Sequence, residues 1–156
     1  MEGCTLTKDH RELQRQICFL FYVSSKEVIK QYTLHLKKYN LTYTGYITLI
    51  AFGDDEILNI KQLGTRIYLN SGTLTPLIKK LVSKGLIEKC RDAEDERNLK
   101  LSLTPAGKAL KHELQHVSQL VAQDMKIDHE DAETLRRILN RFVKQNFPHR
   151  LSHPPQ

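Results

Sequence analysis

The chain of 156 residues contains three cysteines, the residue type most suited to redox chemistry. Cys4, Cys18 and Cys90 are an odd number of cysteines, so they cannot all pair in disulfides within one chain. Since no export signal is expected either, free thiols in a reducing cytoplasm are favoured. Cys18 lies in an apolar segment, where a small buried packing residue is the simplest interpretation. Cys90 lies in a strand-like segment and is also expected to be structural. Chemistry alone therefore favours packing over reactivity for Cys18 and Cys90.

A second candidate for chemistry is the segment His112-Glu-Leu-Gln-His116, which matches the H-E-x-x-H pattern of zinc proteases. On a helix its two histidines could hold Zn²⁺, and Glu113 could activate a water molecule. A third ligand is required, but Gln119 and Ala122 stand where the extended pattern needs Gly and His, and only Glu133 lies at a loosely suitable spacing. We therefore expect no metal, no cofactor and no enzymatic activity.

Composition and charge restrict the class of protein. Hydrophobic residues make up 40% and charged residues 27%, as in an ordinary folded domain. The longest uninterrupted apolar run covers residues 17–23, too short for a membrane span of about 20 residues. The net charge is +6, and residues 61–91 hold seven basic side chains against a single acidic one. Such a basic segment is typical of a protein that binds a polyanion, although a solvated surface looks the same.

Apolar spacing predicts a mainly α-helical chain with one small β-hairpin. A first helix is expected over about residues 8–38. Five further helices are expected to begin at residues of the capping type: Thr42, Asn59, Asn70 or Ser71, Thr104 and Asp128. Segments 86–91 and 99–103 are strand-like, and a polar, charged connection joins them.

Two helices in the C-terminal part of the chain carry apolar stripes that suit packing against other helices. The helix that follows Thr104 is expected to be continuous and to present one apolar seam, made of Ala106, Leu110, Leu114, Val117 and Val121. The last helix has an apolar face made of Leu135, Ile138, Leu139, Phe142 and Val143.

Residues 59–84 have the pattern of a helix–turn–helix, and the hairpin after them has the position of a wing. Small polar residues begin the second helix, so it is slim enough to enter a major groove, and lysines that can reach phosphates follow one turn later. In the wing, Arg97 is expected to enter the minor groove, with nearby acids such as Asp95 orienting it. The expected DNA contacts are Lys61, Ser71, Thr73, Thr75, Pro76, Lys79, Lys80, Lys89, Arg91, Asp95 and Arg97.

Four motifs together resemble the MarR family of bacterial transcriptional regulators. They are the run 69–81 (LNSGTLTPLIKKL), Gly85-Leu-Ile, Asp95-Glu-Arg97 and Leu103-Thr-Pro-Ala-Gly107. The resemblance covers about residues 10–147 and implies a winged helix-turn-helix fold with helical dimerisation arms, acting as a homodimer on a pseudo-palindromic duplex operator. The implied division is an N-terminal dimerisation helix (1–42), a DNA-binding lobe (43–104), C-terminal dimerisation helices (105–147) and a flexible tail (148–156).

The segment around Cys18 is similar to the thiol-based, organic-hydroperoxide-sensing branch of that family (OhrR and SarZ type). The resemblance implies that Cys18 senses the oxidant and that tyrosines at the matching positions Tyr22, Tyr32 and Tyr43 support its sulfur. Cys18 and Tyr32 stand fourteen residues apart, about 21 Å on a straight helix, so a contact between them requires the partner subunit. A sulfenic acid on Cys18 would then be trapped by a low-molecular-weight thiol as a mixed disulfide, or by Cys4.

The sequence therefore predicts a cytoplasmic, homodimeric, DNA-binding regulator, expected to be a repressor, whose binding changes when Cys18 is oxidised. Two alternatives stay open at this point. One is a regulator of the same family that responds to a small aromatic ligand. The other is a winged-helix module that contacts proteins and does not bind DNA.

Overall fold

The computed structural model describes residues 10–91 and 99–147 and consists of helices around one small sheet. The mainly α-helical fold with a small β-sheet is therefore confirmed. The elements in chain order are α1 (His10–Gln14), α2 (Ile17–Leu36), the 3₁₀ helix η1 (Lys37–Tyr39), α3 (Tyr43–Ile50), β1 (Leu58–Asn59), α4 (Ile60–Ile67), α5 (Ser71–Ser83), β2 (Ile87–Arg91), β3 (Leu99–Leu103), α6 (Pro105–Leu114), α7 (Val117–Asp124) and α8 (His129–Asn146).

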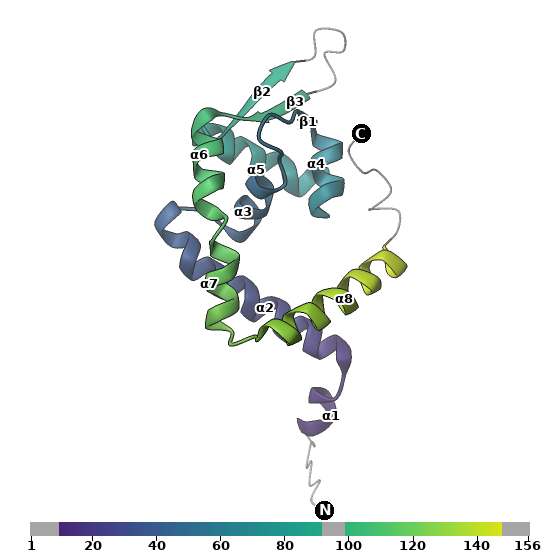
Figure 1. The fold of residues 1–156 in the computed structure, drawn as a ribbon. Coiled ribbons are helices and arrows are strands. Elements are labelled where there is room, and N and C mark those ends of the chain that lie inside the picture. Colours follow the sequence, from purple (N-terminus) through teal and green to yellow (C-terminus); the bar gives the residue numbers. More distant parts are fainter. Residues whose placement is uncertain (1–9, 92–98, 148–156) are drawn as a thin grey trace, which may run out of the picture.

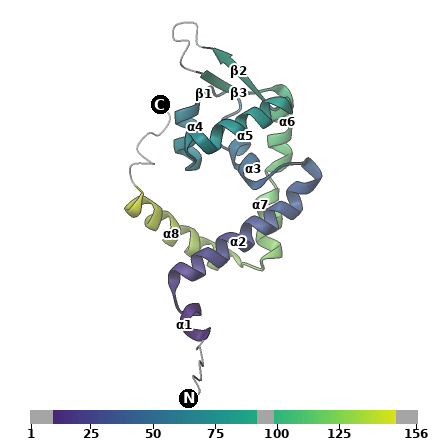
Figure 2. The ribbon, with the colours of Figure 1, turned by 180° about the vertical axis from the view of Figure 1, so that it is seen from behind.

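The elements form a lobe around the sheet and a group of helices outside the lobe (Figure 1). The lobe contains α3, α4, α5, α6 and the sheet, whereas α2, α7 and α8 lie at the opposite end and α1 points away from both. α2 packs along α7, and the view from behind shows α2 crossing below the lobe beside α8 (Figure 2). Within the described residues, no helix is long and apolar enough to cross a membrane.

The core of the lobe lies between its helices and the sheet. It is made of leucine, isoleucine and phenylalanine side chains that are almost fully buried: Leu49, Phe52, Leu58, Leu63, Leu74, Ile78, Leu81, Ile87, Leu101 and Leu103. Leu36 at the end of α2 joins the same core, as do Leu114 and Val117. The C-terminal end of α2 is therefore fixed to the lobe, because moving it would expose this apolar surface to water.

Polar side chains begin five helices, as the sequence predicts. Each accepts a hydrogen bond from the backbone N–H three residues later, and they are Thr42, Asn59, Asn70, Thr104 and Asp128. Asn59 forms a complete capping box, because the Gln62 side chain accepts the Asn59 N–H in return at 2.8 Å. Of the two candidates for the start of α5, Asn70 is the cap.

The sheet contains a third strand that the apolar pattern does not predict. β1 pairs with β3 antiparallel, so that the strand order is β1-β3-β2, with Leu58 opposite Leu101. β1 has two residues, too few for an alternating pattern to appear in the sequence. Its pairing anchors the start of α4 to the wing strands.

The single first helix predicted over residues 8–38 is wrong. α1 ends at Gln14, and Gln16 has an extended backbone with ψ 120°, so a new helix begins after it. The Gln16 carbonyl accepts the first hydrogen bonds of α2, from the N–H groups of Phe19 and Leu20. Apolar periodicity continues across this break, which is why the pattern did not reveal it.

The continuous helix predicted after Thr104 is also wrong, because the chain bends between Leu114 and Val117. Gln115 ends α6 and His116 precedes α7, yet Leu114 and Val117 on either side are both fully buried. α6 packs against α3 in the lobe, whereas α7 packs against α2. The bend lets one apolar stripe cover two surfaces that a straight helix could not reach together.

Thr104 and Gly107 lock the end of the sheet to the start of α6. The Thr104 hydroxyl donates to the Gly85 carbonyl at 2.5 Å and accepts the Gly107 N–H at 3.0 Å, and the Thr104 N–H donates to the Leu86 carbonyl at 3.2 Å. A Cβ at Gly107 would lie 2.0 Å from the Leu86 carbonyl oxygen. Only glycine allows this approach of two backbones.

Replacement of Gly107 by alanine is therefore expected to lower the free energy of unfolding by about 2 kcal/mol or more, since the backbones must separate. Urea unfolding of the purified protein measures this. Gly72→Ala is the matched control: its Cβ would have one neighbour, at 3.4 Å, and alanine is the better helix former. Equal stabilities for the two variants would contradict the close approach.

Candidate nucleic-acid interface and thiol site

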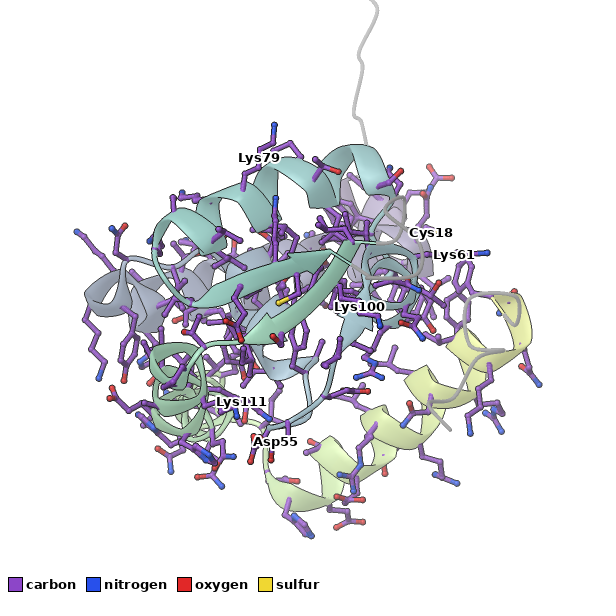
Figure 3. All side chains as sticks on the ribbon, turned by 90° about the horizontal axis from the view of Figure 1, so that it is seen from above. Cys18, Asp55, Lys61, Lys79, Lys100 and Lys111 are labelled. Atoms are coloured by element: carbon purple, nitrogen blue, oxygen red, sulfur yellow. The ribbon has the colours of Figure 1, made fainter. Side chains whose placement is uncertain are left out.

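The two faces of α5 differ sharply in burial. Leu74, Ile78 and Leu81 point into the core and are at most 1% exposed. The side chains on the other face are exposed, and they are the polar and basic residues predicted to contact DNA: Ser71, Thr73, Thr75, Pro76, Lys79 and Lys80. Lys79 projects away from the body of the lobe (Figure 3). The structure therefore brings these six residues together on one surface, which we call the α5 face.

A tight turn sets the direction of α5 relative to α4. Tyr68 ends α4 in the left-handed conformation, with φ 59°, and the Leu69 N–H donates to the Gly64 carbonyl at 3.0 Å. A Cβ at Gly64 would lie 2.6 Å from the Leu69 carbonyl oxygen, so the turn closes directly against α4. Asn70 then caps α5 through the Thr73 N–H at 2.9 Å. The α5 face is held by this backbone arrangement.

Thr75 differs from the other hydroxyl residues of the α5 face. Its hydroxyl donates to the Ser71 carbonyl one turn earlier, at 2.8 Å. The hydroxyl proton is therefore used within the helix, and Thr75 presents a methyl group and oxygen lone pairs outward. In this state it is suited to a thymine methyl group or to a donor, and not to an acceptor.

The remaining predicted DNA contacts lie around α5 or outside the described residues. Lys61 on α4 and Lys89 on β2 are exposed. Arg91 ends β2, but its side chain is not described, and Asp95 and Arg97 fall within residues 92–98, outside the described ranges. These three wing contacts stay predictions.

The acidic loop after α3, residues 54–56, is neutralised by bases from other elements. Lys111 of α6 donates to the Asp54 carboxylate and to the Phe52 carbonyl, each at 2.7 Å. Lys108, one turn earlier, donates to Asp55 at 2.6 Å. The hydrogen bond and charge of Lys111 lower the pKa of Asp54 below its usual value. Figure 3 shows Asp55 and Lys111 on the same side of the lobe, away from Lys79.

Glu56, the third acid of this loop, forms a bidentate ion pair with Arg66 near the end of α4. The two guanidinium nitrogens donate to the two carboxylate oxygens at 2.7 and 2.8 Å, and one of them also donates to the Ala51 carbonyl at 2.5 Å. The Gly53 N–H donates to the same carboxylate at 2.8 Å. The Arg66 hydrogen bond is the main cause that lowers the pKa of Glu56 to about 2. This pair ties α4 to the end of α3.

The H-E-x-x-H segment does not form the arrangement that a zinc protease needs. His112 lies in α6, whereas His116 lies in the bend, directly before α7. The His112 ring nitrogen lies 3.6 Å from the Asp54 carboxylate. Within residues 10–91 and 99–147, no three His, Cys, Asp or Glu side chains come together as a metal site.

Cys18 is exposed on α2, so it is not a packing residue of this chain's own core. Cys90 on β2 is exposed as well, and Cys4 lies outside the described residues. Tyr22 is exposed and stacks near Phe19, with ring centroids 6.4 Å apart. Because α2 is one continuous helix from Ile17 to Leu36, Cys18 and Tyr32 of the same chain stay about 21 Å apart along it.

Tyr32 and Tyr43, predicted to support the thiol, do come together, and a third tyrosine joins them. The ring centroids lie 4.9 Å apart for Tyr32 and Tyr43, 5.2 Å for Tyr32 and Tyr46, and 6.2 Å for Tyr43 and Tyr46. We call these three side chains the tyrosine cluster. Tyr46 was not among the predicted residues, although its spacing of three from Tyr43 places both on one face of a helix.

The apolar side chains at the N-terminal end of α2 and along α8 are exposed in the single chain. Phe21 of α2 contacts Phe142 of α8, with ring centroids 5.3 Å apart, which brings the two helices side by side. Other large apolar side chains of α1, α2, α8 and the residue after α8 are exposed by a third or more: Leu13, Ile17, Leu20, Val23, Leu135, Ile138, Leu139 and Phe147. So many exposed large apolar side chains on neighbouring helices are unusual for a monomer.

Comparison with known proteins identifies the family. The family model described as transcriptional regulator SarA/Rot matches residues 28–114. The chain belongs to this family. The HTH-type transcriptional regulator SarZ of Staphylococcus epidermidis is 54% identical over 135 residues, which cover 86% of this chain and 91% of the relative. SarZ of Staphylococcus saprophyticus is 52% identical, with 86% and 92% covered. Both relatives are HTH-type transcriptional regulators, a class of protein without enzymatic activity.

Solved structures of regulators share the fold. A probable transcriptional regulator from Pseudomonas aeruginosa superimposes with a TM-score of 0.76 at 25% identity, over 84% of this chain and 99% of that one. MepR of S. aureus, solved as a DNA complex, gives 0.72 at 21% identity, over 83% and 98%. Reduced MarR from E. coli gives 0.67 at 19%, over 82% and 96%. The winged-helix fold and the resemblance to MarR-type regulators of the SarZ kind are confirmed.

Replacement of Glu56 by glutamine tests the Arg66 pair. Its folded pKa of about 2 lies below the ordinary 4.5, so the ionised carboxylate contributes stability above about pH 4.5 that is lost as the pH falls toward 2. We expect the variant to be less stable than the parent by about 1–2 kcal/mol near neutral pH, with the difference shrinking in acid.

Urea unfolding at a series of pH values measures this difference. Asp55→Asn is the matched control, because the Asp55 side chain is 91% exposed and its removal should change little. A Glu56→Gln deficit that stays constant from neutral pH into strong acid would contradict the assignment.

Proposed function

We propose that the chain is a homodimeric regulator that binds duplex DNA through the α5 face and the wing, and whose binding changes when Cys18 is oxidised. The observation that carries the DNA-binding part is the α5 face itself, where every predicted contact is exposed and the opposite face is buried. Slim hydroxyl side chains suit base edges, and Lys79 and Lys80 suit phosphates. We further propose that the protein represses transcription by occupying its operator.

The proposal of a homodimer rests on the exposed apolar side chains of α2 and α8. Residues 1–42 and 105–147 would supply the dimerisation helices, and residues 43–104 would form the DNA-binding lobe. A second copy has the same apolar surface, so a two-fold arrangement could cover both surfaces at once. It would also set two α5 faces at the fixed separation that a pseudo-palindromic operator requires.

The proposed sensing step begins with the thiolate of Cys18. Its sulfur attacks the outer oxygen of an organic hydroperoxide with an electron pair, so that an S–O bond forms as the O–O bond breaks. The alkoxide takes a proton from water and leaves as an alcohol, while the sulfur becomes a sulfenic acid. A low-molecular-weight thiol then attacks the sulfenic sulfur, releases water and leaves a mixed disulfide. Either product is bulkier than a thiol between packed helices and would force the lobes to move.

The roles assigned on the α5 face can be separated by mutation. Lys79→Ala is expected to weaken binding to every duplex alike and to lower the salt slope by about one, because one phosphate is no longer neutralised. Thr73→Val removes a hydroxyl and keeps the shape, so it should change the ratio of affinities for operators that differ in sequence, by about tenfold. Titration of several duplexes at two salt concentrations measures both effects.

Lys144→Ala, which removes the same charge from exposed α8, is the control for Lys79→Ala and should leave binding nearly unchanged. Uniform weakening by both Lys79→Ala and Thr73→Val would contradict this division of roles.

Oxidation sensing across two subunits has a sharp test in mixed dimers. Cys18→Ser and Tyr32→Phe homodimers should bind operator, and only Tyr32→Phe should retain a weakened response to cumene hydroperoxide. A mixed dimer of one chain of each kind recreates one intact site if Cys18 works with Tyr32 of the partner subunit, and it recreates none if both act within one chain. We expect the mixed dimer to react faster than the Tyr32→Phe homodimer. Unchanged peroxide sensitivity in Cys18→Ser would overturn the sensor assignment.

A further inference from the structure

Thr75 and Pro76 are neighbours on the exposed side of α5, and together they present mainly carbon atoms to the outside. The Thr75 hydroxyl donates to the Ser71 carbonyl at 2.8 Å, which turns the hydroxyl toward the helix backbone. The Thr75 methyl group then occupies another staggered position of the same side chain. Pro76 lies inside the helix and has no N–H, so the exposed part of this residue is its ring. We call these two side chains the apolar pair.

The rest of α5 lacks the side chains that usually read adenine and cytosine. Residues 71–83 contain no Asn, Gln, Asp or Glu, the residue types that accept hydrogen bonds from the amino groups of these bases in the major groove. Asn70, directly before α5, is occupied as the cap, because its side chain accepts the Thr73 N–H at 2.9 Å. Among the base features of the major groove, the 5-methyl group of thymine is the one that a carbon surface recognises.

Thr73 lies on the opposite flank of the same helix. At about 3.6 residues per turn, Thr73 and Thr75 are directed about 160° apart around the helix axis, so they would approach different parts of a groove. Thr73 is exposed, and within residues 10–91 and 99–147 its hydroxyl has no hydrogen-bond partner. Thr73 therefore keeps a hydroxyl proton for DNA, whereas the hydroxyl proton of Thr75 is already used by the helix.

We propose that the apolar pair determines operator specificity by contacting the 5-methyl group of one thymine in each half-site, and that Thr75 makes this contact with its methyl group and not with its hydroxyl. This inference rests on the proposed function, which sets α5 in the major groove. A contact between carbon surfaces removes both from water, so deletion of either methyl group weakens binding. Deletion of the second methyl group then changes little, because the contact is already lost.

The test removes one methyl group at a time from the DNA and from the full-length protein. The probe is a duplex that the reduced parent protein selects from a randomised library, with each thymine of one half-site replaced in turn by deoxyuridine, which lacks only the 5-methyl group. For the parent, replacement of the contacted thymine should weaken binding about three- to fivefold, as expected for one methyl group. Thr75→Ser removes the protein's methyl group and keeps the hydroxyl that bonds to Ser71, so the same replacement should then change the affinity by less than about 1.5-fold.

Two further variants separate the methyl group from the hydroxyl. Thr75→Val keeps a methyl group and removes the hydroxyl, so it should retain the loss of affinity that deoxyuridine causes in the parent. A contact through the Thr75 oxygen would reverse the pattern, because Thr75→Ser would then keep the preference of the parent and Thr75→Val would lose it. Thr73→Ser is the matched control on the opposite flank: it also removes one methyl group, and it should leave the deoxyuridine effect at the contacted thymine unchanged.

The inference is overturned if no deoxyuridine weakens binding by the parent, if Thr75→Ser shows the same loss as the parent at every thymine, or if the pattern of Thr75→Ser and Thr75→Val is reversed. In each of these cases the protein still selects and binds a duplex, so the proposed function stands. The failure of the proposed function looks different, because the parent then selects no sequence from the library and shifts no duplex in a titration.

Discussion

The unbroken run of α2 is the constraint on which the rest of the molecule depends. Its 20 residues hold Cys18 near one end and Tyr32 near the other, too far apart to meet within one chain. Its C-terminal end is fixed, because Leu36 is fully buried and the His35 ring nitrogen lies 2.6 Å from the Asp124 carboxylate of α7. Its other end exposes apolar side chains. Because a helix cannot shorten without breaking backbone hydrogen bonds, α2 holds its Cys18 end and its lobe end at a fixed separation.

A hydrogen bond connects the end of α5 with the segment that follows α2. Asn40 follows η1 in the left-handed conformation, with φ 53°, and Lys84 at the end of α5 donates its ammonium to the Asn40 carbonyl. α5 is therefore held by the Asn70 turn at its start and by the α2–α3 junction at its end. Lys84 differs in this from Lys79 and Lys80, whose exposed side chains lie on the α5 face.

Local signals in the sequence predicted the elements whose causes are local. Helix starts such as Thr42 and Asn59 were predictable because a cap acts within three residues. The helix α5 was predictable because its apolar residues recur with the helical period. The breaks at Gln16 and Gln115 could not be predicted, since apolar spacing continues through both and only the surfaces packed against them require a bend. β1 has no signal of its own and exists through pairing with Leu101. Tyr46 looks like an ordinary core tyrosine in the sequence, because its contact with Tyr32 of α2 exists only in the folded chain.

The distribution of charge shows most directly how the fold prepares the α5 face. In the sequence, three acids at residues 54–56 stand close to the basic segment 61–91 and would weaken its field if they stayed unpaired. The fold pairs Asp54 and Asp55 with Lys111 and Lys108 of α6, both outside that segment. Glu56 pairs with Arg66, whose guanidinium also donates to the Ala51 carbonyl at the end of α3. The acidic loop is thus neutralised by bases of α4 and α6 and not by Lys79 or Lys80. The positive field of the α5 face is therefore not reduced by ion pairs with this loop.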